Sequence, residues 1–280
     1  YYHIKFLLII KYTKRMTRLV VVFAILVGVF TWIVQYLGYK FVPYLSFGLI
    51  GIIPVTLPLF VFLAYFITWP IEKLISNSYI KKAKKKLELR KDLKVIGVTG
   101  SYGKTTVKNI LGTILSEKYK VCASPSSYNT PLGIAKTILC NLADDDEVFI
   151  AEMGAKQRFD IQELCLMVKP QIGVITGVGN QHLLTFGSIE NLVKTKAELA
   201  EYVFDNKGDL FVNVDNELSK QLADDFKTAI KVSVDEEKSC VYAKDIKSTK
   251  DGSSFELVYE NKSVKCKTIL LGKHNISNII

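Results

Sequence analysis

Hydrophobic and polar positions divide the chain into two parts with different patterns. Between Leu19 and Trp69 the only charged residue is Lys40, and the stretch "GYKFVPYL" splits this run into two segments, 19–39 and 46–69. A helix needs about 20 residues to cross the hydrocarbon core of a bilayer, and each segment is long enough. We therefore expect two transmembrane helices. The alternative, a buried hairpin in a soluble protein, fits poorly with so long a run carrying one charge.

Charge is unevenly distributed in a way that suits a membrane hairpin. Residues 1–94 hold 15 Lys and Arg against 3 Asp and Glu, whereas residues 95–280 hold 22 against 24. By the positive-inside rule, we expect a basic cytoplasmic segment at 1–18 and a basic juxtamembrane linker at 70–93, with the hairpin tip outside. The run "KKAKKK" (81–86) would lie against anionic headgroups; a solvated charged helix is the alternative. We expect no nucleic-acid binding, because the basic residues lie outside the globular part.

From residue 93 the pattern changes to short apolar runs that alternate with amphipathic stretches. This alternation predicts an α/β fold with a mainly parallel, doubly wound sheet. After about residue 229 the pattern becomes β-rich and predicts added antiparallel strands. The expected strands are 94–99, 119–123, 147–152, 171–176 and 209–214, and the expected helices are 104–117, 131–141, 159–168, 189–204 and 216–226.

Two further features concern the cysteines and the ends of the chain. Its five cysteines lie far apart and form no C-x-x-C motif, so we expect reduced thiols in a cytosolic fold rather than a disulfide or zinc framework. The chain begins with Tyr1 and stops within a helical pattern, "GKHNISNII". We therefore expect that residues are missing at both ends.

The stretch "VIGVTGSYGKTTVKNIL" (95–111) predicts a strand, a glycine-rich turn and a helix. Gly100 and Gly103 allow a tight turn whose N–H groups point at an anion, and the following helix adds its positive end. Lys104 would reach the β- and γ-phosphates of a nucleotide, and the Thr105 hydroxyl would hold Mg²⁺. The strict P-loop spacing has a glycine where Val98 stands, so a tight turn with a chance lysine is the alternative.

Three more residues, later in the chain, are candidates for the same site. Glu152 ends an apolar strand, and His182 lies on a glycine-containing loop after the next strand. Because ligands of open α/β sheets bind beyond the carboxyl ends of the strands, both should share a crevice with residues 100–105. Lys196 lies on an amphipathic helix. If each residue is considered alone, Glu152 could instead be a surface acid at the end of a strand, and His182 an ordinary loop residue.

These segments together resemble the ATP-dependent Mur ligases, which form amide bonds in peptidoglycan precursor synthesis. The family's P-loop, T-G-[ST]-x-G-K-[ST], matches Thr99 to Thr105, so Val98 is normal for it. The branch that adds D-alanyl-D-alanine is the most similar. Its likeness rests on "SSYNTPLG" (126–133), "AEMGA" (151–155), H-x-x-x-F-G-S-I-E (182–190), K-x-K-x-E (194–198) and G-x-H-N-x-x-N (272–278). The resemblance covers residues 95–280, which would be a central ATP-binding domain (94–280), incomplete at its C-terminus.

The resemblance also implies roles for individual residues. ATP would be bound by Thr99, Gly100, Ser101, Gly103, Lys104, Thr105, Thr106 and Asn275, with His274 and Asn278 nearby. Two Mg²⁺ ions would be held by Thr105, Glu152, His182 and Lys196, the last as a carbamate formed with CO₂. Asn129 and Thr130 would face the acceptor substrate and the transferred phosphate. Lys104, Glu152, His182 and Lys196 would be the catalytic residues.

The function implied is ATP-dependent ligation at the cytoplasmic side of a bacterial cell membrane. A carboxylate of UDP-MurNAc-tripeptide would be activated as an acyl phosphate and joined to D-Ala-D-Ala, with cell-wall synthesis proteins as further partners. Mur ligases ordinarily carry a UDP-sugar domain where this chain has its apolar segments. Two alternatives therefore stay open: a Mur-like ligase with another acceptor, such as a poly-γ-glutamate synthase or an enzyme of a lipid-linked precursor, and a non-catalytic membrane protein.

Overall fold

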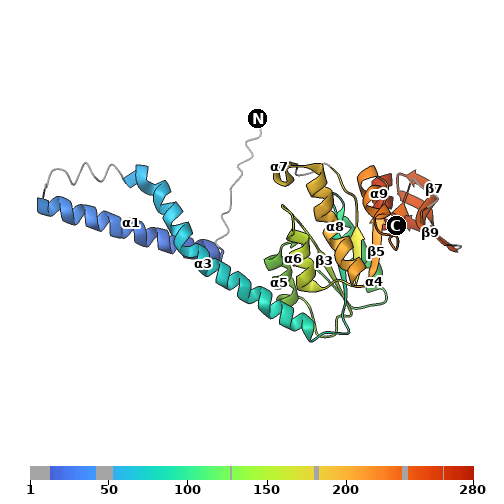
Figure 1. Ribbon diagram of the computed structural model, residues 1–280, viewed down its shortest axis with the longest axis horizontal. Coiled ribbons are helices and arrows are strands. Elements are labelled where there is room, and N and C mark those ends of the chain that lie inside the picture. Colours follow the sequence, from blue (N-terminus) through green and yellow to red (C-terminus); the bar gives the residue numbers. More distant parts are fainter. Residues whose placement is uncertain (1–12, 42–52, 127, 180–182, 235–238, 261) are drawn as a thin grey trace. The chain divides into compact units, whose positions relative to one another are not determined.

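The computed structural model describes residues 13–41, 53–126, 128–179, 183–234, 239–260 and 262–280. The chain divides into two compact units, Tyr1–Ser78 and Tyr79–Ile280. Each unit is treated by itself. Figure 1 draws the described elements in sequence colours.

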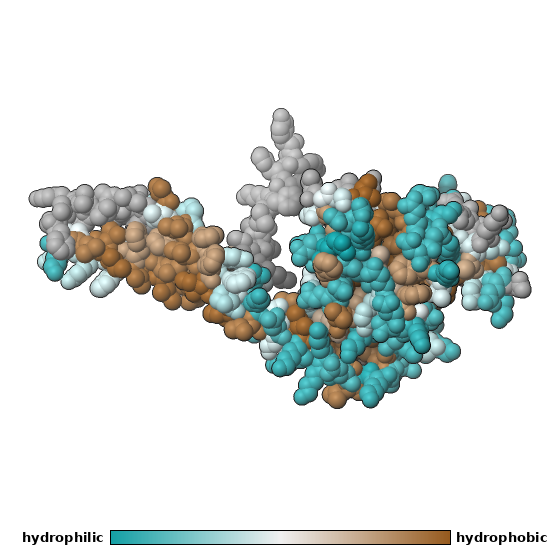
Figure 2. All heavy atoms as spheres, viewed as in Figure 1, coloured by the Kyte–Doolittle hydropathy of each residue, from teal (hydrophilic) through white to brown (hydrophobic). Residues whose placement is uncertain are grey.

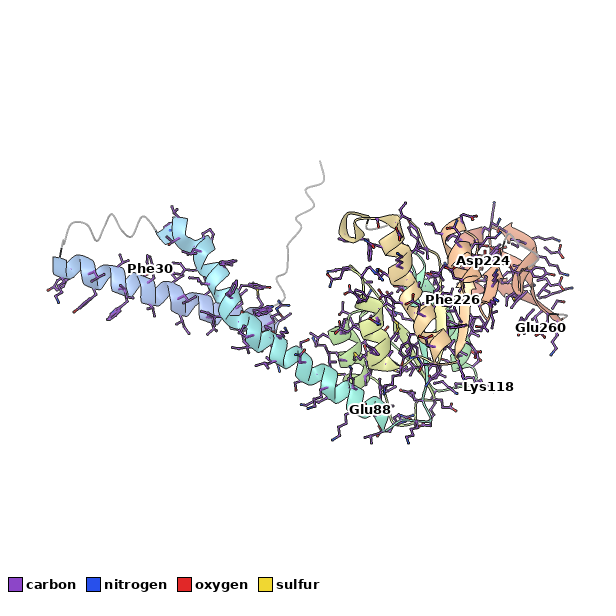
Figure 3. All side chains as sticks on the ribbon, in the orientation of Figure 1. Phe30, Glu88, Lys118, Asp224, Phe226 and Glu260 are labelled. Atoms are coloured by element: carbon purple, nitrogen blue, oxygen red, sulfur yellow. The ribbon has the colours of Figure 1, made fainter. Side chains whose placement is uncertain are left out.

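The first unit contains α1 (Lys14–Phe41) and most of α3 (Ile53–Glu88). The two helices run antiparallel: Phe30, labelled on α1 in Figure 3, packs against Phe60 with ring centroids 5.0 Å apart, and Arg18 pairs with Glu72 at 2.6 Å. By length and composition both helices are candidate membrane spans, with hydropathies of 2.4 and 1.7. Figure 2 shows the hydrophobic surface over this hairpin.

The second candidate helix is longer than the sequence predicts. The span predicted to end at residue 69 and most of the basic linker predicted over 70–93 lie on one continuous helix, because α3 runs through Pro70 to Glu88. Pro58 and Pro70 lie inside the helix and each removes one backbone donor, which does not end the helix here. The last turns of α3 belong to the second unit, where Ala83 is fully buried in its core.

In the part of the chain that the structure describes, the second unit holds a nine-stranded sheet of order β2-β3-β1-β4-β5-β6-β7-β8-β9. The pairs among β1 to β5 are parallel, as predicted, and the pairs β7·β8 and β8·β9 are antiparallel, also as predicted. The pairs β5·β6 and β6·β7 are parallel, although antiparallel strands were predicted after about residue 229. The strands are β1 (Lys94–Thr99), β2 (Val121–Ala123), β3 (Val148–Glu152), β4 (Ile172–Ile175), β5 (Asp209–Asn213), β6 (Ile230–Ser233), β7 (Val241–Thr249), β8 (Gly252–Tyr259) and β9 (Lys262–Thr268).

Helices cover both faces of the parallel part, which confirms the doubly wound prediction (Figure 1). Successive strand residues point to opposite faces: Ile96 and Val98 of β1 pack in one core cluster with α4, whereas Val95 belongs to the core cluster that residues of α5, α6, α8 and α9 share. The helices of the second unit, besides the end of α3, are α4 (Lys104–Ser116), α5 (Pro131–Cys140), α6 (Asp160–Val168), α7 (Leu183–Phe186), α8 (Ile189–Asp205), α9 (Glu217–Asp224) and α10 (Lys273–Ile279).

The predicted elements of the second unit are all present, with ends that shift by a few residues. The short helix α7 and the strand β6 were not predicted as separate elements. After α9, Phe226 packs its ring on Phe204 of α8 with centroids 5.7 Å apart (Figure 3). The five cysteines are free. The strand order brings the carboxyl ends of β1, β3 and β4 side by side, and these ends carry the candidate site.

Candidate active site

The turn between β1 and α4 has the backbone geometry of a phosphate cradle. Gly100 and Gly103 have φ values of 149° and 75°, the region that favours glycine. A Cβ on Gly100 would stand 2.1 Å from Thr176 Oγ1, and one on Gly103 would stand 2.5 Å from Asn278 Oδ1. Gly103 is the N-cap of α4 and supplies no side-chain cap, so the helix presents its positive end to the turn.

Side chains at the turn hold it against the segments that follow β3 and β4. Thr99 is fully buried and donates its hydroxyl to Met153 O at 3.0 Å. The Ser101 hydroxyl bonds both the N–H and the C=O of Gly179 at 3.0 Å, and its own N–H donates to Gly177 O. Any contact of these two residues with a ligand would therefore run through the backbone or need a changed partner.

Lys104 lies over the cradle. Its Nζ donates to the carbonyls of Gly100 (2.8 Å) and Ser101 (3.2 Å). Burial lowers the pKa of Lys104 from its usual value, and the carboxylate of Glu152 opposes that shift. An ammonium at this place can move from the carbonyls to a phosphate oxygen with little displacement.

Glu152 is the centre of the polar contacts at the end of β3. It is 2% exposed, and the parallel register sets it opposite Val98 of β1, next to the cradle. Its Oε2 accepts hydrogen bonds from Thr105 Oγ1 at 2.9 Å and Lys108 Nζ at 3.1 Å, and its Oε1 accepts one from Asn129 Nδ2 at 3.2 Å. The structure thus brings Lys104, Thr105, Glu152 and Asn129 together, as the sequence predicts.

The donor atoms here fit Mg²⁺. Among the described residues no group of three His, Cys, Asp or Glu could hold a metal by itself. Mg²⁺ needs no such group, because it binds through one or two protein oxygens and completes its shell with water and phosphate. The Thr105 hydroxyl and the Glu152 carboxylate are oxygens of that kind, and they stand beside the cradle.

Lys196 lies on α8 and is 4% exposed. Burial, and to a lesser degree the charge of Lys104, lower its pKa to about 8, while Glu198 and Asp160 oppose the shift. No hydrogen bond or ion pair of its ammonium occurs within the described part of the chain. Lys194, two residues earlier, is exposed and pairs with Glu190 at 2.5 Å. Of the two lysines in this motif, only Lys196 is in a buried setting that favours a neutral amine.

The remaining predicted residues divide into three cases. His182 lies outside the described residues, so its predicted role stays a prediction. Thr130 is the N-cap of α5, with its hydroxyl accepting from Gly133 N at 3.3 Å. Asn275 and Thr106 line a groove of about 720 Å³ that runs along α4, β4, β5 and α10 and that His274 and Asn278 also line.

Sequence reasoning missed two charged residues of the site. Lys108 follows Lys104 by four positions on α4, a spacing that puts both on one helix face. Asp215 follows β5 at the carboxyl edge, where a polar run "NVDN" was the available signal. Burial would raise the pKa of Asp215, but hydrogen bonds from Ser233, Ser277, Asn213 and the Val234 N–H lower it overall. These bonds tie α10 to β5 and β6.

In this domain the first strand of the parallel part of the sheet leads through a glycine-rich turn into a helix that begins with Lys104 and Thr105. This arrangement defines a P-loop nucleotide-binding domain. The model of the Mur ligase middle domain matches residues 98–280. The chain therefore belongs to the Mur ligase family.

Relatives agree with this assignment. The chain is 33% identical over 186 residues to the UDP-N-acetylmuramoyl-tripeptide–D-alanyl-D-alanine ligase of Synechocystis (66% of this chain, 38% of the relative). It is 37% identical over 132 residues to the enzyme of that name from Mycobacterium leprae (47% and 25%).

Among solved structures, MurF from Acinetobacter baumannii has a TM-score of 0.66 at 26% identity, covering 72% of this chain and 44% of that one. MurF ligase from Thermotoga maritima in complex with ADP has 0.63 at 27% identity, covering 73% and 47%. The chain thus spans less than half the length of each of these relatives.

Proposed function

We propose that this domain binds ATP and Mg²⁺ and activates a carboxylate for amide-bond formation. The single observation that carries the proposal is the cluster of Lys104, Thr105 and Glu152 at a glycine cradle, with the buried Lys196 on the helix behind it. The sequence likeness to UDP-N-acetylmuramoyl-tripeptide–D-alanyl-D-alanine ligases supports UDP-MurNAc-tripeptide as acceptor and D-Ala-D-Ala as the amine. In this proposal the reaction is a ligation with release of ADP and phosphate.

The chemistry has two steps. A carboxylate oxygen attacks the γ-phosphorus of ATP, the bond to the β-phosphate oxygen breaks, and ADP leaves. The amine nitrogen of the second substrate then attacks the acyl carbon, the acyl–oxygen bond breaks, and phosphate leaves as the nitrogen loses a proton. Catalysis of such transfers rests on positioning and on neutralising charge.

The chain's own residues supply both contributions. N–H groups at the start of α4 and the Lys104 ammonium would bind the phosphate oxygens and offset the charge that develops on them. Thr105 and Glu152 would hold one Mg²⁺, which when bound neutralises phosphate charge. Asn129, fixed to Glu152, would face the acceptor.

We further propose that Lys196 carries a carbamate, and that this anion together with His182 helps hold a second Mg²⁺. The amine must be neutral to attack the carbon of CO₂, and a proton leaves when the C–N bond forms. With a pKa of about 8, roughly a quarter of Lys196 would be neutral at pH 7.5, against about 0.1% of an ordinary lysine. Carbamate formation would replace the buried ammonium cation of Lys196 by an anion whose charge a metal ion can neutralise.

One assay tests the main proposal. Phosphate release by the full-length protein is measured with UDP-MurNAc-tripeptide, with and without D-Ala-D-Ala, and separately with glutamate. We expect release that depends on the dipeptide and falls at least a thousandfold in Lys104→Ala, with the exposed Lys118→Ala as control. Release that glutamate alone supports would favour the alternative of a poly-γ-glutamate-type ligase, which the two candidate membrane helices also suit. No release under any of these conditions would refute both.

We also propose that the protein is anchored in the cell membrane by α1 and α3, with the catalytic domain in the cytoplasm. The support is the length and hydropathy of these helices and the lysines at their ends. Such an anchor would keep the domain close to the membrane, where the lipid-linked steps of wall synthesis and the proteins that catalyse them are located.

A further inference from the structure

Lys108 is a buried charged residue that the proposed mechanism does not use. It lies on α4 and is 1% exposed, as deeply buried as the hydrophobic core around it. A lysine so placed needs oxygen partners, because an unpaired ammonium in the interior is strongly unfavourable. Lys108 has two: the Oε2 atom of Glu152 at 3.1 Å and the carbonyl oxygen of Ser126 at 2.6 Å.

These two partners belong to different parts of the site. Glu152 ends β3 and lies beside the phosphate cradle, where it also bonds Thr105. Ser126 belongs to the loop 124–130 between β2 and α5, of which residues 124–126 and 128–130 are described and which carries Asn129. Ser126 has a φ of 46°, in the left-handed region that a serine adopts only when its surroundings hold it there. A short bond from Lys108 to its carbonyl is one such constraint.

The loop is fixed to the same carboxylate at a second point. Asn129 donates from Nδ2 to Glu152 Oε1, and Asn129 O accepts from Gly154 N at 2.9 Å. A Cβ on Gly154 would come within 2.7 Å of the Asn129 side chain, so glycine permits this approach. One carboxylate is therefore shared between the cradle helix, through Thr105 and Lys108, and the loop, through Asn129.

We propose that Lys108 is a positioning residue that couples the nucleotide end of the site to the loop 124–130. By bonding Glu152 and the Ser126 carbonyl together, it sets where Asn129 stands relative to the cradle. Lys108 touches no reacting atom; its effect passes through the loop and, as far as it concerns the acceptor, rests on the function proposed above.

The test uses the full-length protein and the variant Lys108→Met, which keeps the side-chain length and removes the charge. Lys136→Met, on the exposed side of α5, is the matched control. Hydrogen–deuterium exchange of peptides within 121–133 is the first readout and needs no activity. We expect exchange there to rise at least tenfold in Lys108→Met and to stay unchanged in Lys136→Met and in peptides of α8.

Two further readouts separate coupling from general damage. Binding of a fluorescent ATP analogue without metal should change less than threefold, because the cradle itself is intact. In turnover, KM for UDP-MurNAc-tripeptide should rise at least tenfold while KM for ATP changes less than threefold. If Lys108→Met does not fold, Lys108→Gln replaces it: a carboxamide is too short to reach both oxygens, and the same changes are expected at threefold or more.

Wild-type exchange in 121–133 together with a wild-type acceptor KM, in either folded variant, overturns the coupling. An equal loss of affinity for the nucleotide and the acceptor would also overturn it, because that result indicates a merely structural lysine. If wild-type protein neither binds the analogue nor turns over, the proposed function has failed, while the exchange experiment still decides whether Lys108 fixes the loop.

Discussion

Four lysines in or near the site share one chemistry and differ in what surrounds them. Lys194 is exposed and pairs with Glu190, whereas Lys196, two residues on, is buried without a carboxylate partner in the described part of the chain. Lys104 lies half-buried over the cradle, and Lys108 is fully buried in an ion pair. Burial and partners thus divide these lysines into a solvated cation, a candidate carbamate, a candidate phosphate ligand and a proposed positioning residue.

The carbamate proposal predicts chemical rescue. In Lys196→Ala, turnover should fall at least a hundredfold and recover in part when short carboxylates such as formate or acetate are added, since an added anion can occupy the place of the carbamate. Lys194→Ala is the matched control and should keep wild-type turnover with or without additive. Full activity of Lys196→Ala in plain buffer would contradict the role.

Lys196 also predicts a pH dependence of stability. Its pKa in the folded protein is about 8, against an ordinary value of 10.5. Below pH 8 the lysine is protonated in both states, so the folded state carries the full penalty of a buried charge. Between about pH 8 and 10.5 only the folded chain has released the proton, so stability rises with pH.

The measurement is denaturant unfolding in CO₂-free buffer at pH 7.5 and 9.5. The free energy of unfolding of wild type, relative to that of Lys196→Met, should increase by about 2 kcal/mol between these values. Taking the difference cancels the titration of tyrosines and thiols elsewhere. A flat or falling difference would show that Lys196 has no depressed pKa.

At the scale of the element, local signals mark where three of the described helices begin. Thr130 before Pro131, Ser188 before α8 and Asn216 before α9 each accept a hydrogen bond from the third residue on. Glu198 makes a comparable contact across elements, because its carboxylate accepts from the N–H groups of Phe159 and Gln162 at the start of α6. A helix cap made by the preceding residue can be predicted from the sequence, whereas a contact between two separate elements cannot.

Thr130 gives a prediction at this scale, because it is both a helix cap and a candidate substrate residue. Thr130→Ala should lower the free energy of unfolding by about 1 kcal/mol, the usual effect of losing such a cap. Thr113→Ala, on the exposed face of α4, is the control and should change it by less than about 0.5 kcal/mol. Chemical denaturation measures both.

The same two variants decide whether Thr130 does more than cap α5. If its only role is the cap, KM for the acceptor stays within threefold of wild type at a temperature where the variant is fully folded. A larger rise with ATP binding unchanged would assign Thr130 to the substrate as well.

On the scale of the whole molecule, the chain joins a Mur ligase middle domain to two helices with the length and composition of membrane spans. The span predicted over 46–69 continues without a break into the predicted basic linker, since α3 runs through Pro70 and its last turns pack on the core of the second unit.

The proposed anchor predicts a sidedness. Protease added to inside-out membrane vesicles should digest residues 95–280, and the same protease added to sealed right-side-out spheroplasts should leave them intact. A cytoplasmic marker protein controls for leakage. Digestion only from the outer side would contradict the proposed topology, and recovery of the protein in the supernatant after alkaline carbonate washing would contradict the anchor itself.

The sequence by itself determined the α/β class, the parallel order of strand and helix, and the P-loop, because these depend on local periodicity and on glycines that a tight turn requires. It also pointed to Glu152, since a residue that ends a strand lies at the carboxyl edge of the sheet. Only the tertiary structure decided that Lys108 and Asn129 share the Glu152 carboxylate and that Lys196 is buried while Lys194 is not. Burial and partnership depend on which elements pack together, and that information is absent from the spacing along one chain.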